Sequence, residues 1–148
     1  MRYFEDILVG EKQSFGNYPV TREEVLEFAS RYDPQPFHLS DEAAAQTHFG
    51  RLSASGWHSC AMAMAMVVEN FKVLEHAGLG SPGIDELRFL KPVYPGDTLR
   101  VESEVLEKTR SRSRPEMGSY HTRLKLLNQH DEVVVSFLAI DLIRVRGD

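Results

Sequence analysis

The segment from Trp57 to His76 constrains the fold most, because it contains eight consecutive apolar residues from Ala61 to Val68. A helix that is apolar on every side is expected to be buried on every side. Its alanines allow close backbone approach, and its methionines can fill irregular gaps in a core. Polar residues return at Glu69, Lys72 and Glu75, so we expect the far end of this helix to emerge into solvent. Such a helix needs other elements that wrap around it.

The second half of the chain can supply that wrapping. Leu99, Val101 and Val105 alternate with charged residues, which is typical of a strand with one solvated face. The same reasoning predicts strands over residues 84–90, 120–126 and 133–145, a weaker one over 13–19, and turns at 95–97 and 128–131. One buried helix followed by an antiparallel meander predicts an α+β protein of the hot-dog type, in which an antiparallel curled sheet wraps around a long central helix.

Length, composition and charge limit the alternatives. A chain of 148 residues predicts one domain over residues 1–148, and no apolar stretch is long enough to span a membrane. Glu5 and Asp6 interrupt the apolar run that a signal peptide would need, and Cys60 has no second cysteine to pair with, so we expect a cytoplasmic protein. The net charge of −5 argues against nucleic acid as a partner. The six histidines show no metal-ligand spacing, so we expect no metal.

Two short helices are predicted before the apolar one. Thr21 and Glu24 form a capping-box pattern, in which each side chain bonds to the other's backbone, at the start of the first helix. The dipeptide Asp33-Pro34 ends that helix, because proline disfavours the helical conformation of the residue before it. The second helix is expected to begin after Ser40 and to end near Gly50.

The loop Asp33-Pro34-Gln35-Pro36-Phe37-His38 holds the first candidate for chemistry. An aspartate and a histidine on a proline-stiffened loop can perform acid–base catalysis near neutral pH. Taken alone the pattern is weak, because an aspartate before a proline is more often only a turn former. The second candidate is Gly56, where the apolar helix begins. The first turn of a helix offers unpaired N–H groups and about half an elementary positive charge, so it can stabilise a developing oxyanion.

Four segments together resemble the hydratase signature of the MaoC-like family, which contains (R)-specific enoyl-CoA hydratases and dehydratases. They are residues 28–38, Phe49-Gly50-Arg51, Ser55-Gly56-Trp57 and residues 92–99. The resemblance covers nearly the whole chain. It implies the hot-dog fold, no organic cofactor or metal, an acyl-CoA thioester as substrate, and a homodimer or a higher assembly such as a dimer of dimers.

The resemblance also implies roles for individual residues. Asp33 and His38 would jointly activate a water molecule for syn addition to a trans-2-enoyl thioester, while the Gly56 N–H would polarise the thioester carbonyl. Substrate contacts would come from Gln35, Pro36, Phe37, Ser55 and Trp57. This chain departs from the family pattern at two positions, where Gln35 replaces an asparagine and Ser55 replaces a histidine. We expect neither change to touch the acid–base pair, although both affect which substrate fits.

Several other residues have two interpretations. Arg112 and Arg114 lie in the densest basic stretch, which could clamp the phosphates of coenzyme A or could simply be a solvated hairpin, the slightly better supported reading. Trp57 could anchor the helix or line an acyl pocket. His58 contacts substrate in the less favoured reading, and Cys60 is expected to be a buried, inert thiol.

Two other functions stay open at this point. A hot-dog thioesterase would direct water at the thioester carbon, but the families we know place a carboxylate on or near the central helix, and Glu69 lies too far along it. A non-catalytic acyl-CoA-binding module would keep the fold without the reaction. The Asp33 and His38 pair favours the hydratase.

Overall fold

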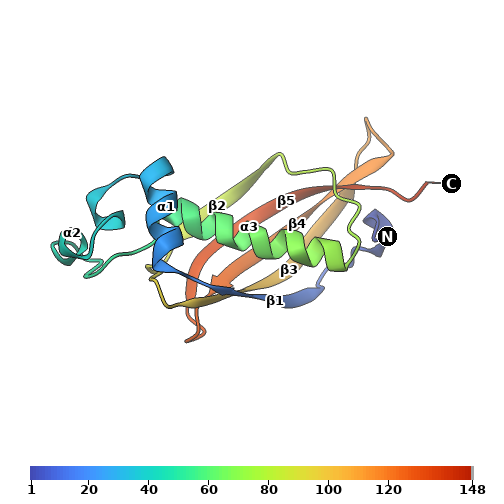
Figure 1. The fold of residues 1–148 in the computed structure, drawn as a ribbon. Coiled ribbons are helices and arrows are strands. Elements are labelled where there is room, and N and C mark those ends of the chain that lie inside the picture. The colour runs from blue at the N-terminus through green and yellow to red at the C-terminus, as the bar shows by residue number, and fades with distance from the viewer. Residues whose placement is uncertain (148) are drawn as a thin grey trace.

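The computed structural model describes residues 1–147, and its centre is a five-stranded antiparallel sheet that curls around one long helix (Figure 1). In chain order the elements are η1 (Phe4–Asp6), β1 (Lys12–Pro19), α1 (Arg22–Tyr32), η2 (Pro36–His38), α2 (Asp41–Ala45), α3 (Gly56–Val73), β2 (Gly83–Phe89), β3 (Thr98–Arg110), β4 (Met117–Leu127) and β5 (Val133–Arg144). The α+β class and the curled sheet around a central helix are confirmed.

The strands lie in the order β1-β3-β4-β5-β2, so the two strands nearest the N-terminus form the two edges of the sheet. In the middle of the sheet Val101 pairs with Leu126, which in turn pairs with Val135. Paired residues point to the same face of a sheet, and all three side chains are buried against α3. The alternation predicted from the sequence therefore sets the inner face of the sheet.

The helix α3 is buried on one side only, so the expectation of burial on every side was wrong. Met62 and Ala63 pack on the sheet and are almost fully buried. On the opposite side Met64 is 49% exposed and Val68 is 41% exposed. The sheet curls around a single face of α3, and α1 covers only its N-terminal part, where His58 stacks on Phe28 (Figure 1). Glu69 and Lys72 reach solvent at the far end, as predicted.

Close packing of α3 against β1 depends on Gly16. This residue has a φ of +93° and lies where the pairing of β1 with β3 shifts register. A Cβ atom at this position would collide with the side chain of Met66 on α3. Glycine tolerates both the positive φ and the absence of space for a side chain. It therefore allows the edge strand to approach the central helix.

The short helices agree with the sequence only in part. The Thr21 side chain caps α1 by accepting from the Glu24 N–H at 3.2 Å, but the Glu24 side chain does not return the bond and turns to Tyr18 and His58 instead. Ser40 caps α2 as expected. That helix is shorter than predicted and ends at Ala45, because the Thr47 hydroxyl and the following turn take over its last carbonyl groups.

The two termini lie near the C-terminal end of α3 (Figure 1). The Arg2 N–H donates to the Glu75 carbonyl at 2.9 Å, and a second small core around Ile7, Tyr120 and Ile143 forms beside it. The N-terminal end of α3 lies about 27 Å from its C-terminal end, which is the length of an 18-residue helix. At this N-terminal end α3 meets α1 and η2. Among the described residues, no helix is both long and apolar enough to cross a membrane.

Candidate functional site

Three elements converge at the N-terminal end of α3. Asp33 is the C-terminal cap of α1, and its φ of −153° shows that the chain leaves the helix there, as expected before Pro34. The chain then forms the short turn η2, which ends at His38. His38 is 5% exposed, and the rings of Phe37 and Phe49 lie against its imidazole at centroid distances of 4.7 and 5.7 Å. The proline-rich loop therefore holds a carboxylate and an imidazole at the tip of α3.

The hydrogen bonds of His38 determine which ring nitrogen faces Asp33. Nδ1 lies 2.8 Å from the Ser53 carbonyl oxygen, which can only accept, so Nδ1 carries the hydrogen and donates it. In the neutral ring Nε2 then carries a lone pair. This atom lies 3.6 Å from Oδ2 of Asp33. Two acceptors thus face one small space.

Asp33 receives two side-chain hydrogen bonds. Gln35 Nε2 donates to Oδ1 at 2.7 Å, and the Ser55 hydroxyl donates to Oδ2 at 2.7 Å. Burial acts to raise the pKa of Asp33, but these two hydrogen bonds and the nearby His38 outweigh it and hold the pKa below its ordinary value. Asp33 is therefore an ionised acceptor at neutral pH.

The contacts of Gln35 and Ser55 correct one expectation. Both residues depart from the family pattern and were expected to leave the acid–base pair untouched, yet each binds one oxygen of Asp33. The side chain of Gln35, one methylene longer than that of asparagine, reaches back to the carboxylate of Asp33, two residues earlier in the chain. Ser55 is fully buried and spans the gap between α3 and the end of α1. Both side chains therefore orient Asp33.

The tip of α3 offers a free donor. Ser55 is its N-terminal cap and accepts from the Trp57 N–H at 3.3 Å, whereas the Gly56 N–H meets no hydrogen-bond acceptor within residues 1–147. A Cβ atom at Gly56 would lie 2.6–2.7 Å from three ring carbons of Phe89. The ring of Phe89 thus lies directly over Gly56, and it also meets Trp57 edge-on at 6.0 Å.

Asp33, His38 and Gly56 open onto one cavity of about 570 Å³. Of the residues expected at the substrate, it is also lined by Gln35, Phe37 and Trp57. Pro36 begins η2 and is not part of the lining, and Ser55 lies behind it. The remaining lining residues are His48, Phe49, Ala54, Ser59, Phe89, Leu90, Lys91, Pro92, Val93 and Val135.

The sequence did not indicate that residues 89–93 belong to the cavity. They form the end of β2 and the segment after it, more than thirty positions after Gly56, and they reach the cavity because β2 is an edge strand beside the tip of α3 (Figure 1). The one indication in the sequence was the segment that begins at Pro92, which resembles the family signature. It did not predict that Phe89 or Lys91 lines the cavity. Phe89 supplies an aromatic wall, and Lys91 also lines the cavity, although its ammonium group is paired with Glu132.

Arg112 and Arg114 lie far from this cavity within one chain. Both are exposed on the turn between β3 and β4, at the end of the molecule that holds the two termini (Figure 1). This turn is stabilised locally, since Arg110 Nε donates to the Pro115 carbonyl at 2.8 Å. A clamp that serves the cavity of the same chain is therefore not formed by these two arginines.

His58 and Cys60 both point away from the cavity. His58 is 2% exposed, stacks on Phe28 at 4.7 Å, and bonds to Glu24 through Nε2 at 3.0 Å. Burial acts to raise the pKa of Glu24, but hydrogen bonds from Tyr18 and His58 outweigh it and keep the pKa low. Burial raises the pKa of the Cys60 thiol, which agrees with an inert cysteine. Residues 1–147 contain no cluster of three or more His, Cys, Asp or Glu side chains arranged to hold a metal ion.

A curled antiparallel sheet around one helix, with polar groups gathered at the helix tip, defines a protein of the hot-dog fold. Residues 6–125 match the family model described as the MaoC like domain. The chain belongs to the MaoC-like domain family.

Three relatives illustrate the likeness. The crystal structure of a MaoC-like dehydratase from Rhodospirillum rubrum is 37% identical, with a TM-score of 0.89 over 99% of both chains. The (R)-hydratase PhaJ1 from Pseudomonas aeruginosa is 28% identical, with a TM-score of 0.69 over 99% of this chain and 87% of that one. The 3-hydroxybutyryl-CoA dehydratase of Methylorubrum extorquens is 32% identical over 118 residues, which are 78% of this chain and 71% of the relative.

Proposed function

We propose that this protein is a hydratase that adds water to a trans-2-enoyl-CoA thioester, or that catalyses the reverse dehydration of a 3-hydroxyacyl-CoA. The observation that carries the proposal is the pair of acceptors, Asp33 Oδ2 and His38 Nε2, 3.6 Å apart beside the free N–H of Gly56. The relatives named as a hydratase and as a 3-hydroxybutyryl-CoA dehydratase support this class of reaction.

The two acceptors suit a water molecule. Water has two O–H groups and can donate one to Asp33 and the other to His38, which leaves a lone pair of its oxygen free to attack. As the oxygen adds to the β-carbon, one of the two groups takes a proton from water, and a proton is delivered to the α-carbon. General acid–base catalysis of this kind contributes about 10²–10⁴-fold in rate. The proposed reaction uses protein groups alone.

The thioester carbonyl is assigned to Gly56. Attack at the β-carbon moves negative charge onto the carbonyl oxygen, where the Gly56 N–H and the positive end of α3 can stabilise it. Loss of one such donor in an enzyme costs about 3–4 kcal/mol of transition-state stabilisation. Phe89 and Trp57 then form the apolar wall beside the reacting double bond.

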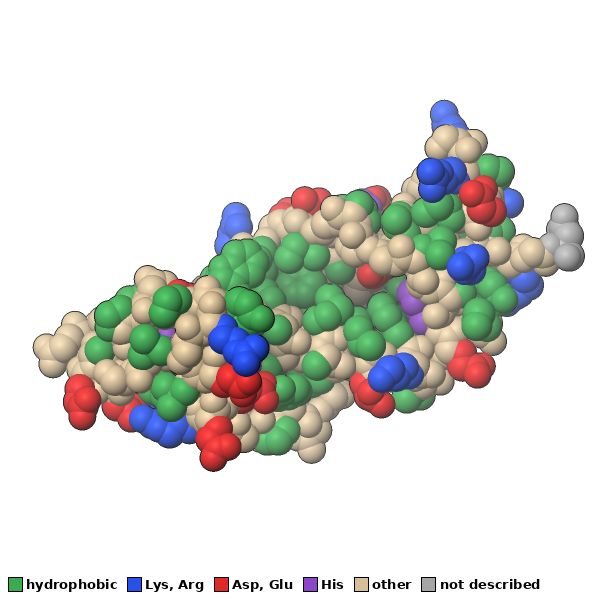
Figure 2. Space-filling model, turned by 45° about the horizontal axis from the view of Figure 1, so that its top comes forward, with side chains coloured by type: hydrophobic (Ala, Val, Ile, Leu, Met, Phe, Trp, Pro, Cys, Tyr) green, Lys and Arg blue, Asp and Glu red, His purple; other side chains and the backbone are tan. Residues whose placement is uncertain are grey.

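We further propose that the protein is a homodimer, with the uncovered side of α3 and the edge strand β2 facing the second copy. Large apolar side chains are exposed along this face, at Trp57, Met64 and Val68 on α3 and at Ile84 and Phe89 on β2. Figure 2 shows hydrophobic side chains gathered on this side of the molecule. An apolar helix face and an unpaired strand edge both gain stability when a second chain covers them.

A dimer also leaves a role for Arg112 and Arg114. They are remote from the cavity of their own chain, so a clamp for the phosphates of coenzyme A would have to serve the site of the second copy. Replacing both arginines by alanine should then raise KM for a coenzyme A thioester and leave turnover of a short pantetheine thioester unchanged. Equal KM values for both substrates in variant and parent would remove the clamp from the proposal.

Crotonyl-CoA separates the three candidate activities. A hydratase removes the absorbance of the conjugated double bond without releasing thiol, whereas a thioesterase releases free coenzyme A. An acyl-CoA-binding module binds the thioester and does neither. We expect loss of absorbance with no free thiol, and release of thiol at a comparable rate would favour the thioesterase. Glu69, the carboxylate of α3 considered for that alternative, lies near the far end of the helix, and its side chain is 72% exposed.

A further inference from the structure

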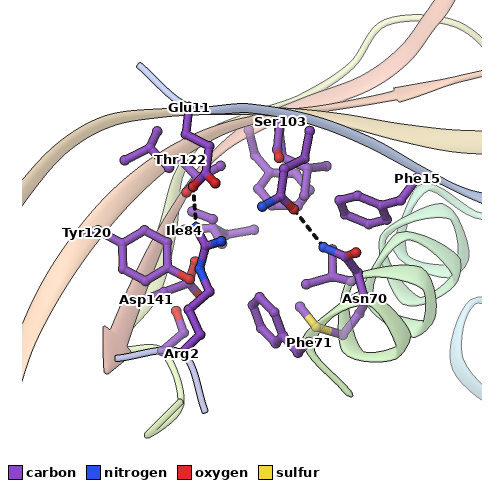
Figure 3. A pocket seen from close by; sticks show the side chains of 18 residues that line it. Arg2, Glu11, Phe15, Asn70, Phe71, Ile84, Ser103, Tyr120, Thr122 and Asp141 are labelled. Carbon is purple, nitrogen blue, oxygen red and sulfur yellow. Dashed lines mark hydrogen bonds and ion pairs between the residues drawn. The ribbon is translucent and has the colours of Figure 1, made fainter. Parts of the chain in front are cut away.

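A second cavity lies between the C-terminal half of α3 and the inner face of the sheet (Figure 3). Its volume is about 80 Å³, and it shares no lining residue with the cavity that contains Asp33 and His38. This is roughly half the volume of an apolar cavity known to hold benzene, so a ligand here must be small.

The walls of this cavity are largely apolar and partly aromatic. Val67 and Phe71 come from α3, Phe15 from β1, and Phe137 from β5. In Figure 3 the rings of Phe15 and Phe71 lie on one side of the open centre and Tyr120 lies on the other. The faces of such rings are negative and attract cations within about 6 Å.

Most polar groups around the cavity already have partners. Arg2 forms an ion pair with Glu11, and Asn70 donates to the Gln13 side-chain oxygen at 2.7 Å. The Tyr120 hydroxyl lies 2.7 Å from Nε2 of His76. Burial lowers the pKa of His76 to about 4, so the ring is neutral and accepts from the tyrosine. The hydrogen bonds and charges of these groups are therefore satisfied within the protein, without a ligand.

Asp141 carries the one charge in the cavity that no other lining side chain among residues 1–147 balances. It pairs with Tyr120 across β4 and β5, so its side chain points into the cavity beside that ring (Figure 3). Within residues 1–147 its carboxylate makes no hydrogen bond and no ion pair. Burial raises the pKa of Asp141 to about 6, which shows how poorly the fold alone supports its charge. The side chain of Asp141 is partly exposed to the cavity, and the one cation among the lining residues within 1–147, Arg2, is already paired with Glu11.

We propose that this cavity binds a small primary ammonium ion, with Asp141 as its counter-ion. Arg2 and Glu11 neutralise one another, so the charge of Asp141 is the uncompensated one. An ammonium group placed beside Asp141 also lies near the face of an aromatic ring, and a short alkyl chain can occupy the apolar remainder. An anion is disfavoured, because two carboxylates face the same space and the guanidinium of Arg2 is already engaged.

The test is binding of n-propylammonium to the assembled protein, measured by calorimetry at pH 7.5. The matched neutral and anionic probes are n-propanol and propionate. We expect the ammonium ion to bind at least about tenfold more tightly than n-propanol, and propionate not to bind, since only the ammonium pairs with the carboxylate. No binding of n-propylammonium, or tighter binding of propionate, would overturn the proposal.

Asp141→Asn is the matched variant, because it keeps the shape of the side chain and removes its charge. It should weaken binding of n-propylammonium by about tenfold or more and leave binding of n-propanol unchanged. Unchanged binding of the ammonium ion would contradict the assignment. Hydration of crotonyl-CoA should be the same in this variant and the parent, because Asp141 lines a separate cavity. This result also tests folding, independently of the ligand.

Lowering the pH provides a second readout on the unmodified protein. Asp141 is faced by Tyr120 from β4, by Arg2 and Glu11 from the N-terminal segment, and by His76 after α3. A fall from pH 7.5 to pH 5 protonates Asp141, while n-propylammonium stays charged, so binding should weaken by about tenfold. Binding that is equal at both pH values would contradict the pairing with Asp141.

Discussion

Asp33 Oδ2 and His38 Nε2 lie 3.6 Å apart, and because the Nδ1 hydrogen of His38 is donated to the Ser53 carbonyl, the neutral ring presents Nε2 to Asp33 as an acceptor. A bridging water would satisfy both. Replacing Asp33 by Asn, or His38 by Gln, places a donor where an acceptor is needed. Each change should lower kcat for hydration of crotonyl-CoA by about 10²–10⁴-fold.

The same variants separate a catalytic loss from a folding loss. Asp33 caps α1 and His38 is buried, so thermal melting should be measured for both. A melting temperature within a few degrees of the parent, with turnover lost, supports the assignment. If both folded variants hydrate crotonyl-CoA at near-normal rates, the site has been assigned wrongly.

Ser55→Ala should move the acidic limb of the pH profile. The Ser55 hydroxyl is one of two side-chain donors that lower the pKa of Asp33, so its removal raises that pKa and protonates Asp33 at a higher pH. The acidic limb of kcat/KM should therefore shift to higher pH. The variant also loses an N-terminal cap and should be less stable by about 1 kcal/mol. Ser55→Thr keeps a hydroxyl and serves as the control, and a limb that does not move in Ser55→Ala would argue against this role.

Gly56→Ala should lower activity through Phe89. The added methyl group would lie 2.6–2.7 Å from the Phe89 ring, so the ring must move or the helix tip must shift away from the substrate. We expect kcat/KM to fall by about tenfold or more, since a small displacement of an oxyanion donor is costly. Phe89→Leu should restore part of the loss in the double variant. If the double variant instead loses as much activity as the two single variants together, the ring and the glycine act independently.

Val68→Glu should weaken the proposed homodimer. Val68 is 41% exposed on the side of α3 that the sheet leaves uncovered, so a charge there is harmless to one chain but would be buried in the interface. An unpaired charge in such a place costs several kcal/mol. Light scattering at increasing protein concentration should show a larger monomer fraction than in the parent. Lys72→Glu, on the solvated end of the same helix, is the control, and a fully dimeric Val68→Glu protein would place the interface elsewhere.

Asp141→Asn should stabilise the protein at neutral pH. The folded state raises the pKa of Asp141 from 3.8 to about 6, so between these values the folded protein binds the proton more tightly than the unfolded chain. The aspartate therefore lowers stability as the pH rises through 4 to 6, and the full penalty is present above pH 6. We expect the variant to gain about 1–3 kcal/mol at pH 7.5 and nothing near pH 3.5. Urea unfolding at both pH values measures this, and a variant that is less stable at pH 7.5 would show that the carboxylate has a partner.

The sequence placed Asp33 and His38 on one short loop, because these two residues are neighbours in the chain. Asp33 and His38 are five positions apart, and the prolines between them limit the backbone to few conformations. Their common orientation depends in addition on Ser53 and Ser55, which bind His38 and Asp33 from outside the loop. In contrast, the sequence did not show that Ser55 donates to Asp33, because that contact joins residues 22 positions apart.

Phe89 is a residue whose place in the cavity could not be predicted from the sequence. Its position in a strand follows from the local pattern, but a strand pattern does not say which edge of the sheet it occupies. Only the order β1-β3-β4-β5-β2 brings the end of β2 to Gly56. Arg112 and Arg114 lie on the exposed turn between β3 and β4 at the opposite end of the molecule, where the sequence had favoured a solvated hairpin slightly over a phosphate clamp.

The sequence by itself determined most of the helices and strands and placed Asp33 and His38 on one loop, since helix and strand periodicity, caps and proline effects act over a few residues. The tertiary structure alone decided that α3 is covered on one side, that Phe89 lies over Gly56, and that Asp141 lines a cavity without a hydrogen-bond partner among residues 1–147. These relations join segments far apart in the chain. They are set by how the whole sheet curls and packs, which no local pattern of residues contains.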